Sequence, residues 1–154
     1  EASRKSIRSD VDFVPTFEEV MGMFEAKGVD LKKIEEQSEL SEASGDGRGF
    51  AVSGGVANAV VDCIRELDPD REVKVANAEG LADCRKLLQM AKTGKYDGYL
   101  LEGMACPGGC VAGAGTLQPI AKSAAAVNIN KKNAKKQCAL SSAYKEQLES
   151  LEEK

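Results

Sequence analysis

The chain has 154 residues, which is the size of one domain. Its formal net charge of −4 gives no electrostatic basis for binding nucleic acid. It contains no histidine, so imidazole general bases, Ser-His-Asp catalysis and histidine-bearing zinc sites are excluded. No apolar run approaches the roughly 20 residues of a membrane-spanning helix, so we expect no membrane partner. Because no secretory signal is recognisable, the five cysteines predict reduced thiols and a cytoplasmic location. The first residue is not Met, and we expect the chain to begin inside a longer protein.

The first segments predict a strand followed by a helix. Residues 10–14 have the apolar pattern of a short strand. Thr16 then caps a helix, Glu19 completes a capping box, and Gly28 ends the helix. The apolar residues of this helix recur at the spacing of one buried face, which comprises Phe17, Val20, Met21 and Phe24.

The rest of the chain alternates helices and strands. The expected elements are a helical piece at 30–37, a loop at 38–49, helix 56–67, strand 72–76, helix 81–92, strand 96–101 and helix 130–154. The residues expected to face the core are Val56, Val60, Cys63, Ile64, Leu67, Leu81, Cys84, Leu88 and Ala91. Because strands alternate with helices, we predict an α/β fold with a mainly parallel β-sheet flanked by helices.

The stretch L-E-G-M-A-C-P-G-G-C-V-A-G-A-G, at residues 101–115, is the strongest candidate for chemistry. Cys106 and Cys110 lie among glycines just after a predicted strand, where the ligands of parallel sheets collect. Thiolates are soft ligands that suit iron–sulfur clusters, zinc or copper(I). If Pro107 opens a helical turn, the two cysteines share a face at roughly 5–6 Å between Cβ atoms. Two ligands do not complete a four-cysteine site, so partners are needed from elsewhere.

Three alternatives compete with a cluster site at this loop. The two cysteines could be buried in a tight turn, form a redox disulfide despite lacking C-x-x-C spacing, or bind zinc without a second ligand pair. Cys63, Cys84 and Cys138 fall on the apolar sides of predicted helices, so packing is the favoured interpretation for them. The glycine-rich stretches at residues 45–50 and 113–118 fail the G-x-G-x-x-G pattern, and neither predicts a phosphate site.

Residues 102–115 resemble the third cluster-binding signature of the iron-only, or [FeFe], hydrogenases, E-x-M-A-C-x-x-G-C-x-x-G-G-G. Three further stretches agree with family patterns in the same order. S-D-V-D-F-V-P-T at residues 9–16 resembles D-V-D-x-V-L-T-T, and F-A-V-S-G-G-V at residues 50–56 resembles F-G-x-T-G-G-V. Residues 80–88 resemble a G-L-x-x-A-x-x-L-L helix, so the resemblance covers most of residues 1–120.

The resemblance implies a [4Fe-4S] cluster joined to a diiron subcluster, together the H-cluster, and reversible reduction of protons to dihydrogen. Cys106 would ligate the cubane and Cys110 would bridge it to the diiron subcluster. Met104 would pack near the diiron centre as the catalytic candidate, and Phe50 and Ser53 would line the pocket. The other cubane cysteines would lie on the N-terminal lobe of the same parent protein, so the isolated chain is expected to be inactive. A ferredoxin-like electron carrier would be the redox partner.

The implied organisation is one lobe of a two-lobed catalytic domain at residues 1–125, followed by a helical extension at residues 126–154. The sequence departs from the family pattern at Ala51, Asn58 and Ala114. These departures lie around the pocket and suit a divergent or hydrogen-sensing member. The alternative is a relative that acts in cytosolic iron–sulfur protein assembly and binds a cubane without the diiron unit.

Overall fold

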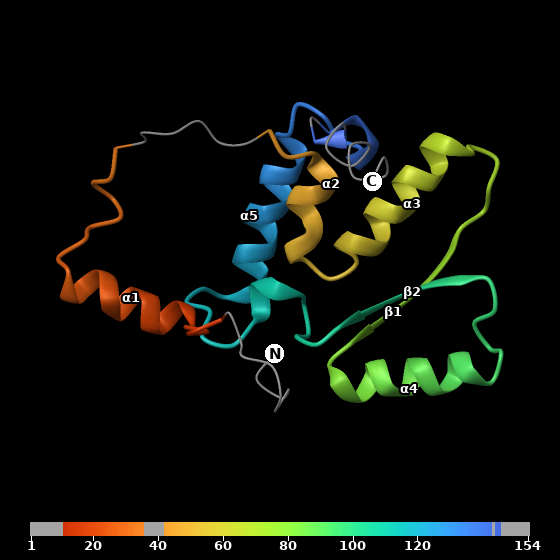
Figure 1. Ribbon diagram of the computed structural model, residues 1–154, viewed down its shortest axis with the longest axis horizontal. Coiled ribbons are helices and arrows are strands. Elements are labelled where there is room, and N and C mark those ends of the chain that lie inside the picture. The colour runs from red at the N-terminus through yellow and green to blue at the C-terminus, as the bar shows by residue number, and fades with distance from the viewer. Residues whose placement is uncertain (1–10, 36–41, 143, 146–154) are drawn as a thin grey trace. The chain divides into compact units, whose positions relative to one another are not determined.

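The computed structural model describes residues 11–35, 42–142 and 144–145. Within these residues the chain forms five α-helices, three short 3-10 helices and a two-stranded parallel sheet (Figure 1). The predicted α/β class, with a parallel sheet flanked by helices, is confirmed. None of the described helices is long and apolar enough to cross a membrane.

The chain divides into two compact units, which are described separately. Unit 1 comprises residues 1–37 and 114–117, and unit 2 comprises residues 38–113 and 118–154. All of the predicted site residues belong to unit 2. The boundary predicted after residue 125 concerns the extent of a family domain and stays a prediction.

The sheet of unit 2 consists of β1 (Lys74–Glu79) and β2 (Tyr99–Met104), which pair in parallel along their whole length. α4 (Leu81–Lys92) connects the two strands and has the bounds that the sequence predicts. Gly80 separates β1 from α4 at φ +79°, a conformation that glycine adopts without strain. Its N–H group donates to the carbonyl oxygen of Met104 at 2.8 Å, which extends the ladder by one bond.

Both strands begin later than predicted. The sequence predicts starts at residues 72 and 96, whereas the strands begin at Lys74 and Tyr99. The hydrogen-bonded ladder continues through polar positions, among them Asn77 opposite Glu102. A prediction that places strands on runs of apolar residues leaves such positions out. The difference arises because the pairing partner, which is remote in sequence, decides the extent of a strand.

The core of unit 2 is built largely from small residues. Its buried apolar side chains, among the residues that the structure describes, are Ala57, Ala59, Val61, Leu87 and Ala134. α3 (Gly55–Leu67) begins where Gly55 packs directly on the carbonyl group of Gly49, an approach that leaves no room for a Cβ atom. Close packing of this kind favours alanine and glycine at the contact.

The predicted inward faces of α3 and α4 are partly wrong. The predicted core residues that are exposed are Val56, Val60, Leu67, Leu81 and Leu88, and those that are half-buried are Cys63, Ile64, Cys84 and Ala91. The buried residues of α3 are instead Gly55, Ala57, Ala59 and Val61, and that of α4 is Leu87. In α3 the prediction weighted large apolar side chains, whereas the backbone of Gly49 approaches Gly55 so closely that no side chain fits there.

α2 (Gly45–Arg48) forms within the region predicted to be a loop, and it lies beside α5 (Ile120–Lys132; Figure 1). Ser44 caps α2, because its hydroxyl oxygen accepts the N–H group of Gly47 at 3.1 Å. The loop prediction is therefore wrong for these residues; residues 38–41 of that loop lie outside the described part.

The helix predicted over residues 130–154 is confirmed for residues 130–132, which end α5, and is wrong for residues 133–142, which contain only the 3-10 helix η3 (Ala139–Ser141). Two carbonyl groups of this segment are taken by α2. The N–H group of Gly45 donates to Lys136 at 2.8 Å, and that of Asp46 donates to Gln137 at 3.0 Å. Long-range pairing thus replaces the intrahelical bonds. Residues 146–154 lie outside the described part.

Unit 1 contains α1 (Phe17–Ala26), which has the predicted capping box. The Thr16 hydroxyl accepts the N–H group of Glu19 at 3.3 Å, and the Glu19 carboxylate accepts the N–H group of Thr16 at 2.6 Å. The helix ends before Gly28, which has φ +67°. The predicted burial of its apolar face is wrong, because no residue of α1 is buried and Phe17 is 63% exposed.

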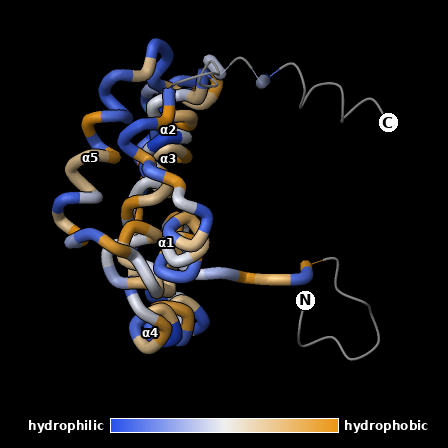
Figure 2. The backbone as a smooth tube through the Cα atoms, turned by 90° about the vertical axis from the view of Figure 1, so that its left-hand side faces the viewer, coloured by the Kyte–Doolittle hydropathy of each residue, from blue (hydrophilic) through white to orange (hydrophobic). Residues whose placement is uncertain are grey.

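The strand predicted at residues 10–14 does not form in its described part. Residues 11–16 have no regular structure, although Figure 2 shows hydrophobic residues in this stretch. Phe13 and Val14 are exposed. A strand requires a partner for its ladder, and the sheet of the described residues is made by β1 and β2. Residues 30–35 likewise form turns and no helix.

Candidate functional site

Cys106 and Cys110 lie in the loop that follows β2, at the carboxyl end of the parallel sheet. Cys106 is half-buried, and Cys110 is exposed at the first position of η2 (Cys110–Ala112). The Gly109 N–H group donates to the carbonyl oxygen of Cys106 at 2.9 Å and closes a turn. The helical turn considered at Pro107 is absent, because Gly108 and Gly109 adopt φ values of +96° and +94°. Two consecutive turns, rather than one helical face, carry the two thiols.

The cysteine loop docks by its backbone onto the segment that precedes α3. A Cβ atom at Gly109 would lie 2.6 Å from the backbone nitrogen of Ser53 and 2.7 Å from the carbonyl oxygen of Ala51. The Ser53 N–H group donates to the carbonyl oxygen of Gly108 at 3.1 Å. Glycine is therefore required at this contact, and the predicted pocket residue Ser53 is tied to the cysteine loop through its main chain.

The carboxylate of Glu102 fixes the start of α3 from the neighbouring strand. Glu102 is 8% exposed and accepts the N–H groups of Gly54 at 2.6 Å and of Val56 and Ala57 at 3.1 Å each. The N-cap residue Gly54 has no capping side chain of its own. Three charge-assisted hydrogen bonds and the positive end of the helix offset the cost of burying this carboxylate.

A second carboxylate holds the cysteine loop directly. Glu79, the last residue of β1, accepts the N–H group of Gly108 at 3.0 Å. Glu79 pairs with Met104 in the sheet, so the two strands end together beneath the loop. The loop is thus held from β1 through Glu79 and from the segment before α3 through Ser53.

The remaining predicted pocket residues flank the loop. Met104 is the last residue of β2 and is half-buried. Phe50 is 45% exposed on η1 (Gly49–Ala51), and η1 packs against η2, which begins with Cys110. The structure therefore gathers the elements that carry Phe50, Ser53, Met104 and the two cysteines at one end of the sheet.

Sequence reasoning missed Glu102 and Glu79 as anchors of this region. Glu102 gives a usable signal, since an acidic residue in the apolar run before the cysteines needs a buried partner. The start of α3 gives the matching signal, because Gly54-Gly55 offers no side-chain cap. Glu79 gives no comparable signal, because an acid at the end of a strand is ordinarily solvated.

The other three cysteines make different contacts. Cys84 on α4 packs against the sheet, with its sulfur 3.5 Å from the carbonyl oxygen of Ala78 and 3.6 Å from that of Met104. Cys63 on α3 lies near Cys138, which precedes η3, and α3 packs against η3. Burial raises the pKa of the Cys63 thiol, and the contact with Cys138 raises it further.

Two thiols in one glycine-rich loop form a donor set for a soft metal centre. In the described part of the chain, no group of three or more Cys, His, Asp or Glu residues could hold a metal ion. The thiols of Cys106 and Cys110 are the type of ligand that an iron–sulfur cluster takes. By themselves they supply half of the ligands that a four-thiolate cubane needs.

Comparisons with known proteins identify a family. Residues 1–114 match the family described as "Iron only hydrogenase large subunit, C-terminal domain". The "Periplasmic [Fe] hydrogenase large subunit" of Nitratidesulfovibrio vulgaris is 30% identical over 140 residues, covering 72% of this chain and 33% of that protein. "Protein NAR1" of Arabidopsis thaliana is 26% identical over 144 residues, covering 72% of this chain and 30% of that protein.

The chain spans about a third of the length of these curated relatives. The family match nevertheless extends over most of the chain and includes β1, β2, α3, α4 and the cysteine loop. The chain therefore belongs to the family of the iron-only hydrogenase large subunit, C-terminal domain.

Proposed function

We propose that this chain is the cluster-binding C-terminal lobe of an [FeFe]-hydrogenase, an oxidoreductase, and that it works within a longer parent protein. Its role is to supply two cysteine ligands to the H-cluster for the reversible interconversion of protons and dihydrogen. The observation that supports this most directly is the loop of Cys106 and Cys110, which Ser53 and Glu79 hold at the carboxyl end of the sheet.

In this proposal Cys106 would be a ligand of the [4Fe-4S] cubane, and Cys110 would be a ligand of both the cubane and the diiron subcluster. When bound, the H-cluster would supply the redox chemistry and the electron transfer. Met104, Phe50 and Ser53 line the pocket around the diiron subcluster, where the half-buried side chain of Met104 excludes water. The chain's own contribution is to hold both thiols in fixed positions.

The other half of the site is proposed to come from the N-terminal lobe of the same parent protein, which would supply the two remaining cubane cysteines. The isolated chain would then be inactive. A ferredoxin-like electron carrier is the proposed redox partner, in the cytoplasm. All five cysteines are free thiols, which agrees with a reducing compartment.

A second candidate is an iron–sulfur protein of the cytosolic assembly type, which holds a cubane without the diiron subcluster. Two observations favour keeping it. One of the two relatives bears a name that does not call it a hydrogenase. Ala51 and Asn58, beside the docked loop and at the start of α3, depart from the pattern of the hydrogenases.

The experiment that tests the proposal uses the longest form of the protein, purified without oxygen. Iron and acid-labile sulfide are measured, infrared spectra are searched for carbonyl and cyanide bands, and dihydrogen production is followed with a reduced viologen. We expect a cubane, both kinds of infrared band and dihydrogen. A cubane without the bands and without dihydrogen would support the second candidate in place of the first.

The ligand assignment has its own controls. Cys106→Ser and Cys110→Ser should each lose most of the bound iron, whereas Cys84→Ser, which removes a thiol packed against β2, should retain it. Full iron content in both loop variants would contradict the assignment of Cys106 and Cys110.

A further inference from the structure

Two thiols outside the cysteine loop contact each other in unit 2. Cys63 lies on α3, and Cys138 immediately precedes η3. α3 packs against η3, and Cys138 is among the groups close enough to raise the pKa of the Cys63 thiol. Both are free thiols and half-buried. The fold therefore brings together two cysteines that are far apart in the sequence.

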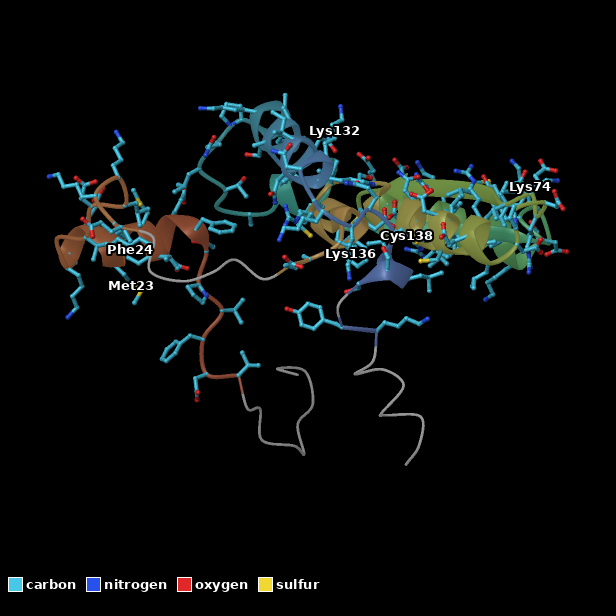
Figure 3. The ribbon with its side chains drawn as sticks, turned by 90° about the horizontal axis from the view of Figure 1, so that it is seen from above. Met23, Phe24, Lys74, Lys132, Lys136 and Cys138 are labelled. Carbon is cyan, nitrogen blue, oxygen red and sulfur yellow. The ribbon has the colours of Figure 1, made fainter. Side chains whose placement is uncertain are left out.

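The backbone on both sides of Cys138 is held against α2. The carbonyl oxygens of Lys136 and Gln137 accept N–H groups of α2 at 2.8 and 3.0 Å. On the other side, the N–H group of Ala139 donates to the carboxylate of Asp46 at 3.1 Å. Figure 3 shows Cys138 and Lys136 in this segment. The segment that carries Cys138 is thus held beside α2 on both sides of this residue.

A small oxidant can reach Cys138. A cavity of about 320 Å³ is lined by Cys138 together with charged side chains of both signs from α2, α3 and α5. The lining includes Asp62 and Arg65, an ion pair at 3.5 Å, and Lys131, which pairs with Asp46 at 3.5 Å. Such a cavity suits one half of a small disulfide that carries ammonium and carboxylate groups.

We propose that Cys63 and Cys138 form a reversible disulfide by exchange with a low-molecular-weight disulfide such as oxidised glutathione. The Cys138 thiolate attacks one sulfur of glutathione disulfide, so that a mixed disulfide forms and one glutathione thiolate leaves. The Cys63 thiolate then attacks the Cys138 sulfur, and the second glutathione leaves as the Cys63–Cys138 bond forms. The two protein thiols lose two protons and two electrons, and the two glutathione molecules gain them.

The order of these steps follows from the surroundings of the two thiols. Cys138 lines the cavity, so it meets the oxidant first. Burial raises the pKa of Cys63, and so do the contact with Cys138 and the charge of Asp46, which makes Cys63 the resolving thiol. The bond would enclose the sheet, α4 and the loop of Cys106 and Cys110 in one covalent loop. Because a cross-link restricts the unfolded chain, the oxidised form should resist unfolding more than the reduced form.

The test equilibrates the full chain in glutathione buffers of increasing oxidised fraction and blocks free thiols with N-ethylmaleimide before peptide mass spectrometry. We expect Cys63 and Cys138 to lose alkylation together and a peptide linked through both to form. Dithiothreitol should reverse the change. The midpoint of thermal unfolding should rise by at least ~4 °C on oxidation.

The controls separate this pair from the other cysteines. Cys63→Ser and Cys138→Ser should abolish the linked peptide and the rise in midpoint, whereas Cys84→Ser and the double variant Cys106→Ser with Cys110→Ser should keep both. If the single variants fold poorly, the linked peptide of the unsubstituted chain still decides the question. A lasting glutathione adduct on Cys138 beside a free Cys63, or a Cys106–Cys110 bond as the sole disulfide, would overturn the proposal.

Discussion

The carboxylate of Glu102 accepts the backbone N–H group of Gly54 at 2.6 Å, across 48 positions of the sequence. The same carboxylate accepts the N–H groups of Val56 and Ala57. α3 is therefore capped by β2 and not by the residue that precedes it. Because β2 runs directly into Cys106, one buried side chain couples the start of a helix to the position of a proposed iron ligand.

Removal of this cap should be costly. Glu102→Ala leaves three N–H groups at the start of α3 without their acceptor, so we expect the free energy of unfolding to fall by about 2–4 kcal/mol in urea titrations. Glu102→Gln keeps one acceptor oxygen and should lose less. The exposed Glu66 on the same helix gives the matched control, and Glu66→Ala should change the free energy by no more than about 0.5 kcal/mol. Equal losses in the two alanine variants would refute the role of Glu102.

The docking of the cysteine loop can be tested with two glycines that differ in their surroundings. Gly98 and Gly109 have φ values of +77° and +94°, but a Cβ atom meets nothing within 4 Å at Gly98 and lies 2.6 Å from the nitrogen of Ser53 at Gly109. Gly98→Ala should cost about 1 kcal/mol through backbone strain alone. Gly109→Ala should cost about 3 kcal/mol or more, since the loop must also move. Chemical unfolding of both variants measures the difference.

The bond from Glu79 to the loop should control local opening. Glu79→Ala removes the acceptor of the Gly108 N–H group, so we expect hydrogen exchange at that amide to accelerate by about tenfold, the equivalent of one hydrogen bond. Asp83→Ala serves as the control, because it breaks an exposed ion pair with Lys86 on α4. An unchanged exchange rate at Gly108 in the Glu79 variant would show that Ser53 alone holds the loop.

The raised pKa of Cys63 predicts a dependence of stability on pH. Burial is the largest cause, and the contact with Cys138 and the charge of Asp46, which Lys131 faces from α5, also act on this thiol. A group whose pKa is higher in the folded than in the unfolded chain stabilises the fold below its unfolded pKa and loses that contribution as the pH rises. The free energy of unfolding of the reduced chain should therefore fall as the pH rises above about 8.5, the ordinary pKa of a cysteine thiol.

The measurement for this prediction is a series of urea titrations with dithiothreitol present. In Cys63→Ala the group that titrates is gone, so the fall with pH should be shallower whatever the overall stability of the variant. Identical slopes in the two chains would assign the pH dependence to other groups.

Local signals in the sequence predicted local structure well. The capping box of Thr16 and Glu19 and the bounds of α4 depend on residues within a few positions of each other, and both are confirmed. The order α3, β1, α4 and β2 is confirmed, because each of these elements has a local signal of its own. The cysteine loop stands out from its composition alone, although its two turns replace the helical face considered for it.

The features that escaped prediction depend on remote partners. The ladder, not the apolar run, decides where β1 and β2 begin. The buried face of α3 consists of Gly55, Ala57, Ala59 and Val61, and at Gly55 the backbone of Gly49 comes too close for a side chain. The segment after α5 is not helical, and two of its carbonyl groups accept hydrogen bonds from N–H groups of α2. None of these three features can be predicted from a single stretch of sequence.

The pairing of α2 with the segment after α5 has a consequence for the order in which unit 2 is completed during synthesis. α2 has four residues, too few to persist by itself in water. The carboxylate of its Asp46 accepts the N–H group of Ala139, which is synthesised 93 residues later. The turn next to the start of α3 is therefore among the last parts of unit 2 to settle. A chain released just after α5 would carry the complete cysteine loop on a scaffold whose α2 lacked its hydrogen bonds with residues 136–139.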